Sequence, residues 1–304
     1  MTSSLHALLL LSDSALPLGS FAFSSGLESY LAHSKHQSQF QSQIPPSTTT
    51  APRGGPPQPQ QWKPTPASLH LFLHHSLHNQ ASTALPFMLA AHRSPHRLLE
   101  LDDILDASTA CTVARRASTA QGRALASLWT RALRDGITPS ETSAPAFDAV
   151  ENYIATFTSG AIGPGGGAGT KDGIEALLDA APQAHLPPLF GAVTRAMGLA
   201  EGDAAYVFLL NHAKAVLSAA VRAGVMGPYQ SQAVLAGREV EGWILGVVEE
   251  VRCRGRREGT VQDEGRGIEA DEAWRLVEEA GVSIPAMDLW MGRHEVLYSR
   301  IFNS

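Results

Sequence analysis

Apolar residues that recur three and four positions apart restrict the fold of this chain more than any other feature of its sequence. Such spacing places the apolar side chains on one face of an α-helix. It predicts helices over residues 67–91, 104–133 and 206–221. The last helix is expected to stop at Gly224, because glycine is common just after a helix. Since no convincing series of strands with alternating polarity accompanies these helices, the sequence predicts an all-α fold in a single helical domain, residues 1–304.

Three segments are too polar or too rich in glycine to belong to such a packed domain. Residues 34–66 contain the run PRGGPPQPQQ and are rich in Gln, Pro, Ser and Thr. Burial of so few apolar groups cannot offset the entropy lost on ordering, so we expect a disordered low-complexity insertion there. Residues 158–173, TSGAIGPGGGAGTKDG, are expected to form a glycine-rich loop, and residues 254–267 a charged loop.

Composition and charge argue against several classes of function. The 304-residue chain is 44% hydrophobic and has a net charge of -6. Affinity for phosphate backbones comes from clustered Lys and Arg, so a nucleic-acid partner is not expected. The apolar run LHALLLL at residues 5–11 is too short to span a membrane. With only Cys111 and Cys253, there is no disulfide framework, and we expect a cytoplasmic protein that binds neither nucleic acid nor a membrane.

The sequence lacks the motifs of two common kinds of catalytic site. The glycine-rich segment is not a phosphate-binding Walker A loop, because Lys171 is followed by Asp172, whose charge would repel phosphate. The serines of residues 12–31, SDSALPLGSFAFSSGLESYL, are not in a Gly-x-Ser-x-Gly elbow, and no histidine is implied as their base. The sequence therefore predicts a protein that is not an enzyme.

Histidines on one helix face are the remaining candidates for metal chemistry. His70, His74 and His78, in SLHLFLHHSLHNQ, are four residues apart. Histidines with this spacing bind zinc in many proteins. No carboxylate or cysteine completes the set, which favours a polar helix face over a metal site. A metal-dependent hydrolase that uses these three histidines remains an alternative.

Three blocks of the sequence resemble the UreF family of urease accessory proteins. The first is LLLLSDSALPLGSFAFSSGLESYL at residues 8–31. The second is LPPLFGAVTRAMGL at 186–199, which precedes a long helix that ends SAAVRAG at 218–224. The third is IPAMDLWMGRHEVLYSRIFNS at 284–304, and the weaker QGRAL segment at 121–125 also agrees. The blocks occur in the family order and frame nearly all of the chain outside the three insertions, so the resemblance is specific.

The resemblance implies a UreF-like helical bundle that acts as a non-catalytic scaffold. It implies binding to a UreD/UreH-type accessory protein and to the GTPase UreG, on the way to nickel insertion into apo-urease. It also implies a homodimer within that assembly. Modulation of the UreG GTPase, and passage of nickel in transit through the assembled complex, follow only by analogy, and no resident cofactor is implied. A generic helical adaptor outside urease maturation is the second alternative.

The resemblance also implies which residues bind partners. They are Pro17, Gly19, Phe23, Ser24, Glu28, Gly227, Gln232, Arg293, His294, Glu295, Tyr298, Ser299, Arg300 and Phe302. Some positions depart from the family pattern, which often has tyrosine in place of Phe23 and glutamine in place of Ser25. Pro228 and Ser231 depart as well.

The C-terminal block predicts a helix and a tail over residues 284–304. Ser283 is the expected N-cap, and Pro285 suits the first helical turn. The three-and-four spacing predicts a core-facing side formed by Met287, Trp290, Met291 and His294. We expect the tail to dock on the UreD/UreH-type partner, because its apolar residues need burial. Folding back onto its own subunit is the alternative.

Overall fold

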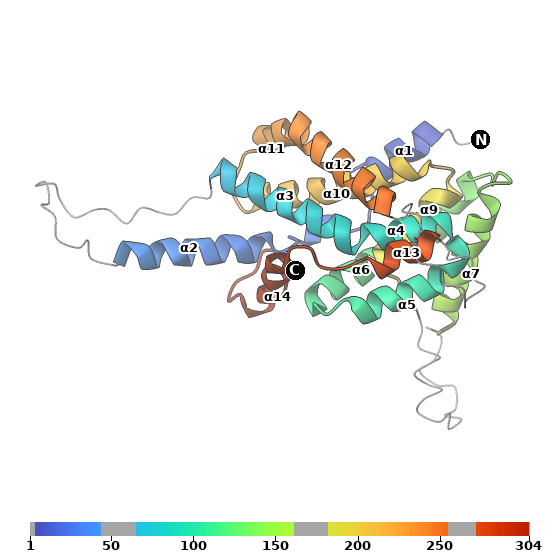
Figure 1. Cartoon of the computed structure of the whole chain (residues 1–304), viewed down its shortest axis with the longest axis horizontal. Coiled ribbons are helices and arrows are strands. Elements are labelled where there is room, and N and C mark those ends of the chain that lie inside the picture. Colours follow the sequence, from blue (N-terminus) through green and yellow to red (C-terminus); the bar gives the residue numbers. More distant parts are fainter. Residues whose placement is uncertain (1–3, 44–64, 161–181, 255–271, 304) are drawn as a thin grey trace, which may run out of the picture.

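The protein is described by a computed structural model that covers residues 4–43, 65–160, 182–254 and 272–303 (Figure 1). All regular structure within these ranges is helical, which confirms the predicted all-α fold. Residues 44–64 of the predicted insertion lie outside the described residues, as do the predicted glycine-rich loop from residue 161 and the predicted charged loop from residue 255.

The described ranges form α-helices and short helical turns. The α-helices are α1 (Ser4–Ser12), α2 (Leu27–Gln43), α3 (Pro66–Thr83), α4 (Leu85–Arg93), α5 (Leu98–Ser108), α6 (Thr112–Leu128), α7 (Ala144–Gly160), α9 (Leu186–Ala196), α10 (Glu201–Arg222), α11 (Pro228–Leu235), α12 (Arg238–Arg254), α13 (Glu272–Glu278) and α14 (Pro285–Arg293). The short helical turns are η1 (Ser20–Ala22), η2 (Pro95–Arg97), η3 (Trp129–Leu133), η4 (Arg134–Gly136) and η5 (His294–Val296).

Two of the three helices predicted from periodicity are each divided in the structure. The segment predicted at 67–91 forms α3 and α4, and Pro86 lies in the first turn of α4, where its missing N–H is tolerated. The prediction of one helix over 104–133 is wrong, because the chain breaks between α5 and α6. There Thr109 adopts an extended backbone, and its hydroxyl donates to the carbonyl of Leu105 at 2.6 Å. Such local side-chain bonds favour helix ends over helix interiors.

The third predicted helix is confirmed. It forms α10, which begins five residues earlier than predicted and ends at the turn where Gly224 has φ of +70°. By length and composition α10 is long and apolar enough to cross a membrane, but 56% of its most apolar window is buried inside the described protein. A core helix of a globular protein has these same properties.

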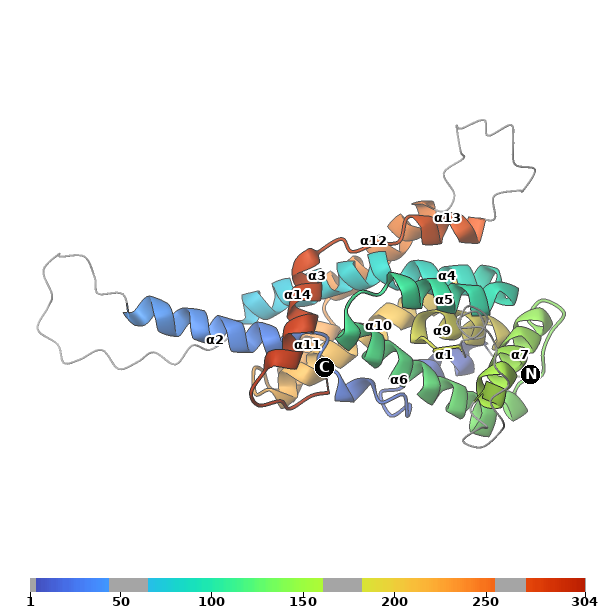
Figure 2. The same cartoon turned by 90° about the horizontal axis from the view of Figure 1, so that it is seen from below.

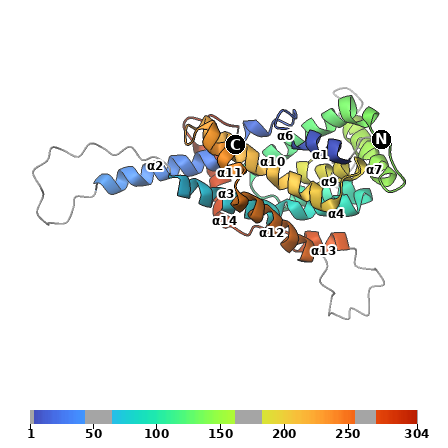
Figure 3. The same ribbon diagram turned by 90° about the horizontal axis from the view of Figure 1, so that it is seen from above.

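The beginning of the predicted disordered insertion is helical. α2 continues to Gln43, so residues 34–43 belong to a helix, and Pro66 at the other end already begins α3. The reason is local, because neither proline nor glycine interrupts the chain between Leu27 and Gln43. In Figures 1, 2 and 3 α2 extends away from the body of the protein, and only its first part lies beside α14 and α10.

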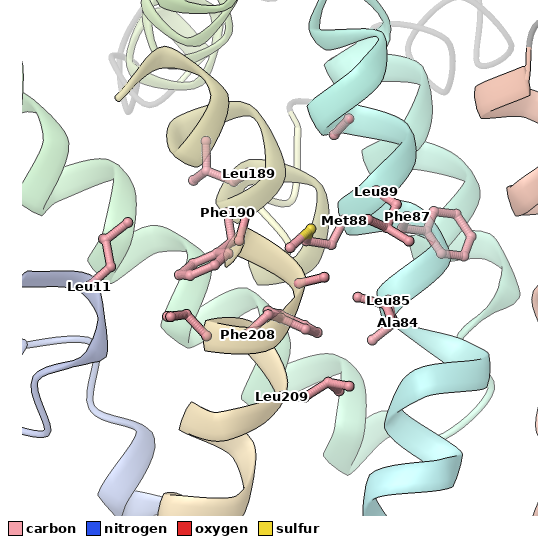
Figure 4. Packing of buried hydrophobic residues seen from close by; sticks show 14 of the residues in the cluster. Leu11, Ala84, Leu85, Phe87, Met88, Leu89, Leu189, Phe190, Phe208 and Leu209 are labelled. Carbon is pink, nitrogen blue, oxygen red and sulfur yellow. The ribbon is translucent and has the colours of Figure 1, made fainter. Parts of the chain in front are cut away.

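The core is built around α9, which contacts α4, α5, α6, α7 and α10. Phe190 of α9, Met88 and Leu89 of α4, and Phe208 of α10 point into a common interior (Figure 4). The backbones of α4 and α9 touch, because a Cβ added to Gly191 would lie 2.0 Å from the carbonyl oxygen of Met88. Only glycine permits so close an approach. The second block of the sequence is therefore the centre of the fold.

An ion-pair network ties α10 to two neighbouring helices. Nε of Arg93 in α4 lies 2.7 Å from the carboxylate of Glu201, and Nε of Arg252 in α12 lies 2.9 Å from it. Burial alone would raise the pKa of Glu201, but the hydrogen bonds and charges of the two arginines outweigh it and hold this pKa at about 2. The carboxylate is therefore ionised across the physiological range.

Helix α14 confirms the predicted core-facing side but not the predicted cap. Met287 and His294 are buried, and Trp290 packs against the core cluster. The N-cap is Ile284 and not Ser283. Ser283 is one position too early, and its hydroxyl instead accepts a hydrogen bond from Ser82 in α3 at 2.8 Å.

Candidate functional site

The N-terminal block folds as a loop that connects α1 to α2. Gly19 has φ of +73°, Ser25 has φ of +51° and Gly26 has φ of +82°. Positive φ is uncommon for residues with a side chain, so the two glycines of the block are explained by backbone conformation. The loop carries η1 and buries Phe23 and Ser24.

Gly26 is also required because α14 packs directly on it. A Cβ at this position would lie 3.0 Å from the Cβ of Trp290 and 3.1 Å from the amide nitrogen of Met291. The next residue, Leu27, is fully buried. Packing at Gly26 and Leu27 brings the C-terminal block against the start of α2, and Figure 2 shows α14 crossing α2 there.

Glu28 holds the C-terminal tail through three hydrogen bonds. The imidazole Nε2 of His294 donates to Oε2 of Glu28 at 3.0 Å. The amide of Ile301 donates to Oε1 at 2.6 Å, and the amide of Phe302 donates to Oε2 at 3.3 Å. His294 is fully buried, so a carboxylate at position 28 is the partner that its ring needs. We call the packed segments 19–28 and 294–303 the clasp.

Two arginines reinforce the clasp from neighbouring helices. Arg222, in the last turn of α10, places its guanidinium 4.4 Å from the ring centre of Phe302 and donates to the carbonyl of Phe21. Arg116 of α6 donates to the carbonyl of Asn303 at 3.0 Å. The amide of Asn303 in turn donates to the carbonyl of Ala22 at 2.8 Å. The tail is therefore joined to the N-terminal loop by backbone and side-chain contacts.

Arg116 also takes part in an exposed charge cluster on the tail. It lies 2.7 Å from the carboxylate of Glu295, which lies 3.2 Å from Arg300. The hydrogen bond from Arg116 lowers the pKa of Glu295. Glu295 is thus a carboxylate at neutral pH, in the same C-terminal block as the exposed Arg293 and Ser299.

The clasp buries one aromatic residue of the tail and exposes several apolar residues. Phe302 is only 4% exposed, whereas Tyr298 is fully exposed. Val296, Ile301 and Phe21 have exposed fractions of 76%, 65% and 64%. Large apolar side chains that are exposed to solvent and surrounded by charged residues are typical of a surface that contacts another protein.

The structure brings together some of the residues predicted to bind partners and separates others. Most predicted residues of the N-terminal loop and the tail meet at the clasp, where Glu28, His294 and Phe302 make intramolecular contacts. Pro17 is exposed just before the clasp, and Arg293 is the last residue of α14. Gly227 is the N-cap of α11 and Gln232 lies within this helix, which is apart from α14 and the C-terminus in Figure 1. Gln232 is exposed. The amide of Gly227 donates to Oε1 of Gln230, within the same helix, at 2.9 Å.

Sequence reasoning missed Arg116 and Arg222 as residues of this site. Arg222 lies within the quoted segment SAAVRAG, so the block contained the residue without revealing its role. Gln121 of the QGRAL segment also reaches the loop, because its Oε1 accepts from the hydroxyl of Ser20 at 2.8 Å. Two sequence blocks that are far apart are thereby joined.

A cavity of about 310 Å³ lies beneath the loop, between α3, α6, α10 and α14. Phe23 and Met291 line it, together with Ser76 and His212, whose Oγ and Nε2 are 2.7 Å apart. Burial lowers the pKa of His212 to about 4, so its ring is neutral at pH 7. The cavity therefore has a polar, uncharged group in the wall formed by α10.

The three histidines considered as metal ligands lie along α3 but do not meet at one point. Nδ1 of His70 is 3.3 Å from a carboxylate oxygen of Glu239. His74 and His78 have ring centres 4.4 Å apart, and burial together with the neighbouring histidines lowers the pKa of His74. Within the residues that the structure describes, no group of three His, Cys, Asp or Glu side chains is arranged to hold a metal ion. The hydrolase alternative thus has no assembled three-ligand centre in this part of the chain.

The fold and the clasp define an all-helical protein whose N-terminal loop and C-terminal tail form one surface. Residues 64–238 match the model of the UreF family. A UreF-like urease accessory protein of Schizosaccharomyces pombe is 32% identical over 98% of this chain and 97% of its own length. Urease accessory protein 6 of Cryptococcus neoformans is 29% identical over 99% of this chain and 97% of its own length. Urease accessory protein F of Arabidopsis thaliana is 26% identical over 96% of this chain and 89% of its own length. The chain belongs to the UreF family.

Proposed function

We propose that this chain is a non-catalytic scaffold of urease maturation and that the clasp is its docking surface for a UreD/UreH-type accessory protein. Membership of a family whose relatives are urease accessory proteins supports the role in maturation. The observation that supports the docking surface is the exposure of Tyr298, Ile301, Val296 and Phe21 on segments whose backbone is held by Glu28. A rigid backbone that presents apolar side chains lowers the entropy lost on binding.

The wider assembly is part of the same proposal. The scaffold joins the UreD/UreH-type protein to the GTPase UreG and apo-urease, as a homodimer in the cytoplasm, and nickel passes through the complex as cargo. Gly227 and Gln232 on α11 are candidates for a second contact, because Tyr229 between them is 90% exposed. The scaffold could thereby hold two partners at separate places.

Co-purification tests the proposal with a substitution that spares the fold. Ile301→Asp keeps the amide that donates to Glu28 and changes only a side chain that is 65% exposed. We expect loss of the UreD/UreH-type protein from the co-purified urease accessory set, because a charge would be buried in an apolar contact. Leu245→Asp is the matched control, since Leu245 is 52% exposed on α12.

Both variants should retain the circular dichroism of the unaltered chain. Normal partner capture by Ile301→Asp would refute the docking surface. If no urease accessory protein co-purifies with the unaltered chain, the role in maturation is refuted and the generic helical adaptor is favoured.

A further inference from the structure

Helix α3 carries a pair of imidazole rings that the proposed docking surface does not use. His74 and His78 are partly exposed, and their ring centres lie 4.4 Å apart with an angle of 47° between the ring planes. Neither ring forms a hydrogen bond within the described part of the chain. Two neighbouring polar rings with nitrogen atoms free to bind a ligand therefore lie one helical turn apart.

The neighbouring helix α12 helps to fix this pair. The ring of Trp243 packs edge-on against His74 at 4.9 Å and against His70 at 5.3 Å. This contact limits the rotation of the His74 ring without occupying a nitrogen. A restrained ring loses less side-chain entropy when it binds a ligand.

The geometry selects two histidines and not three. A helix rises about 1.5 Å per residue, which separates positions 70 and 78 by about 12 Å, too far for one ion to bind both rings. Nδ1 of His70 already faces the carboxylate of Glu239 at 3.3 Å. His75 is adjacent to His74 in the sequence, and its ring centre is 6.0 Å away. His74 and His78 are thus the closest pair of the four.

We propose that His74 and His78 chelate a divalent late first-row transition-metal ion, with water in the remaining coordination positions. Imidazole nitrogen suits Ni²⁺, Cu²⁺ and Zn²⁺ and binds Mg²⁺ or Ca²⁺ poorly. Histidines at positions i and i+4 of a helix are a common arrangement for binding such ions. This site is separate from the clasp and does not depend on partner binding.

Metal titration of the purified full-length chain tests the site, with Ni²⁺ as the probe. Calorimetry should give saturable binding, and the fluorescence of Trp243 should be quenched, because its ring lies 4.9 Å from His74. The chain has five tryptophans, so the Trp243 signal is obtained by comparison with Trp243→Phe. Mg²⁺ should neither bind measurably nor quench.

Substitutions assign the ligands. His78→Gln should weaken Ni²⁺ binding by roughly tenfold or more, because one imidazole cannot chelate. His75→Gln is the matched control on the same helix and should leave affinity unchanged. Circular dichroism should show that both variants stay folded.

The site is overturned by absence of saturable Ni²⁺ binding, by unchanged affinity in His78→Gln, or by an equal loss in His75→Gln. Ile301→Asp, which tests the clasp, should bind Ni²⁺ like the unaltered chain. Failure of the docking surface and failure of the metal site are therefore separate results.

Discussion

Replacing Glu28 by alanine should release the C-terminal tail while the helical core remains folded. The change removes the acceptor of three hydrogen bonds, from His294 and from the amides of Ile301 and Phe302. A hydrogen bond to a charged group contributes about 1.5–3 kcal/mol, and a neutral one about 1 kcal/mol. Even at the lower figure the clasp loses about 3 kcal/mol, which raises the open-to-closed ratio by about 150-fold.

Hydrogen exchange measures this release directly. The amides of Ile301 and Phe302 should exchange about 100-fold faster in Glu28→Ala, because local opening controls their exchange. Amides of α9 should be unaffected, since that helix is the centre of the core. The control Glu295→Ala removes exposed ion pairs with Arg116 and Arg300, and should change exchange by less than about tenfold.

Partner binding gives the second measurement. If the clasp presents the docking surface, Glu28→Ala should weaken capture of the UreD/UreH-type protein, because the tail must be ordered again on binding. Unchanged protection of the two tail amides would refute the reasoning about Glu28. Uniformly faster exchange throughout the core would show that Glu28 stabilises the whole fold and not the tail alone.

Three further predictions concern stability and chemistry. The pKa of Glu201 is held at about 2, below its usual value, so its stabilising contribution is complete above about pH 4.5 and is lost as pH falls toward 2. Because Glu201 is partly exposed, we reduce the figure that the pKa shift alone would give, and expect Glu201→Gln to lower the free energy of unfolding in urea by about 2 kcal/mol at pH 7. At pH 3 the loss should be about half as large. An equal loss at both pH values would contradict the pKa argument. Gly191→Ala should lower the free energy of unfolding by about 2–3 kcal/mol or more, because the added Cβ would lie 2.0 Å from the Met88 carbonyl oxygen. The control is Gly246→Ala in α12, where an added Cβ meets nothing within 4 Å. In a thermal melt this control should be neutral or slightly stabilising. The purified chain should hydrolyse neither urea nor GTP, and turnover that follows this polypeptide through purification would contradict the scaffold proposal.

The elements that sequence predicted well are those set by local chemistry. α10 was predictable because its apolar stripe and the stop at Gly224 lie within one continuous segment. The break after α5 was not predictable from periodicity, since the apolar spacing continues across Thr109 while the hydroxyls of Ser108 and Thr109 bond to the carbonyl of Leu105 at the helix end. The spacing of apolar residues indicates which helix face is buried, but it does not indicate where a short turn interrupts the helix.

The candidate site was predictable only in part. The resemblance selected Glu28 and His294, but their contact with each other depends on tertiary packing that no local pattern reveals. The role of Arg222 is likewise invisible until Phe302 is placed against it. Gly26 shows the same limit, because the turn explains its positive φ while its close approach to α14 needs the folded structure.

The contact between Glu28 and His294 also constrains the order in which the chain folds. These residues are 266 positions apart. Closing so long a loop from the unfolded chain costs about 5 kcal/mol, more than the three hydrogen bonds of Glu28 return at their lower value. We therefore expect the clasp to form after the helices between its two segments have assembled and brought them close. A partner that binds the clasp would discriminate between finished and unfinished chains, and would engage only those whose core is complete.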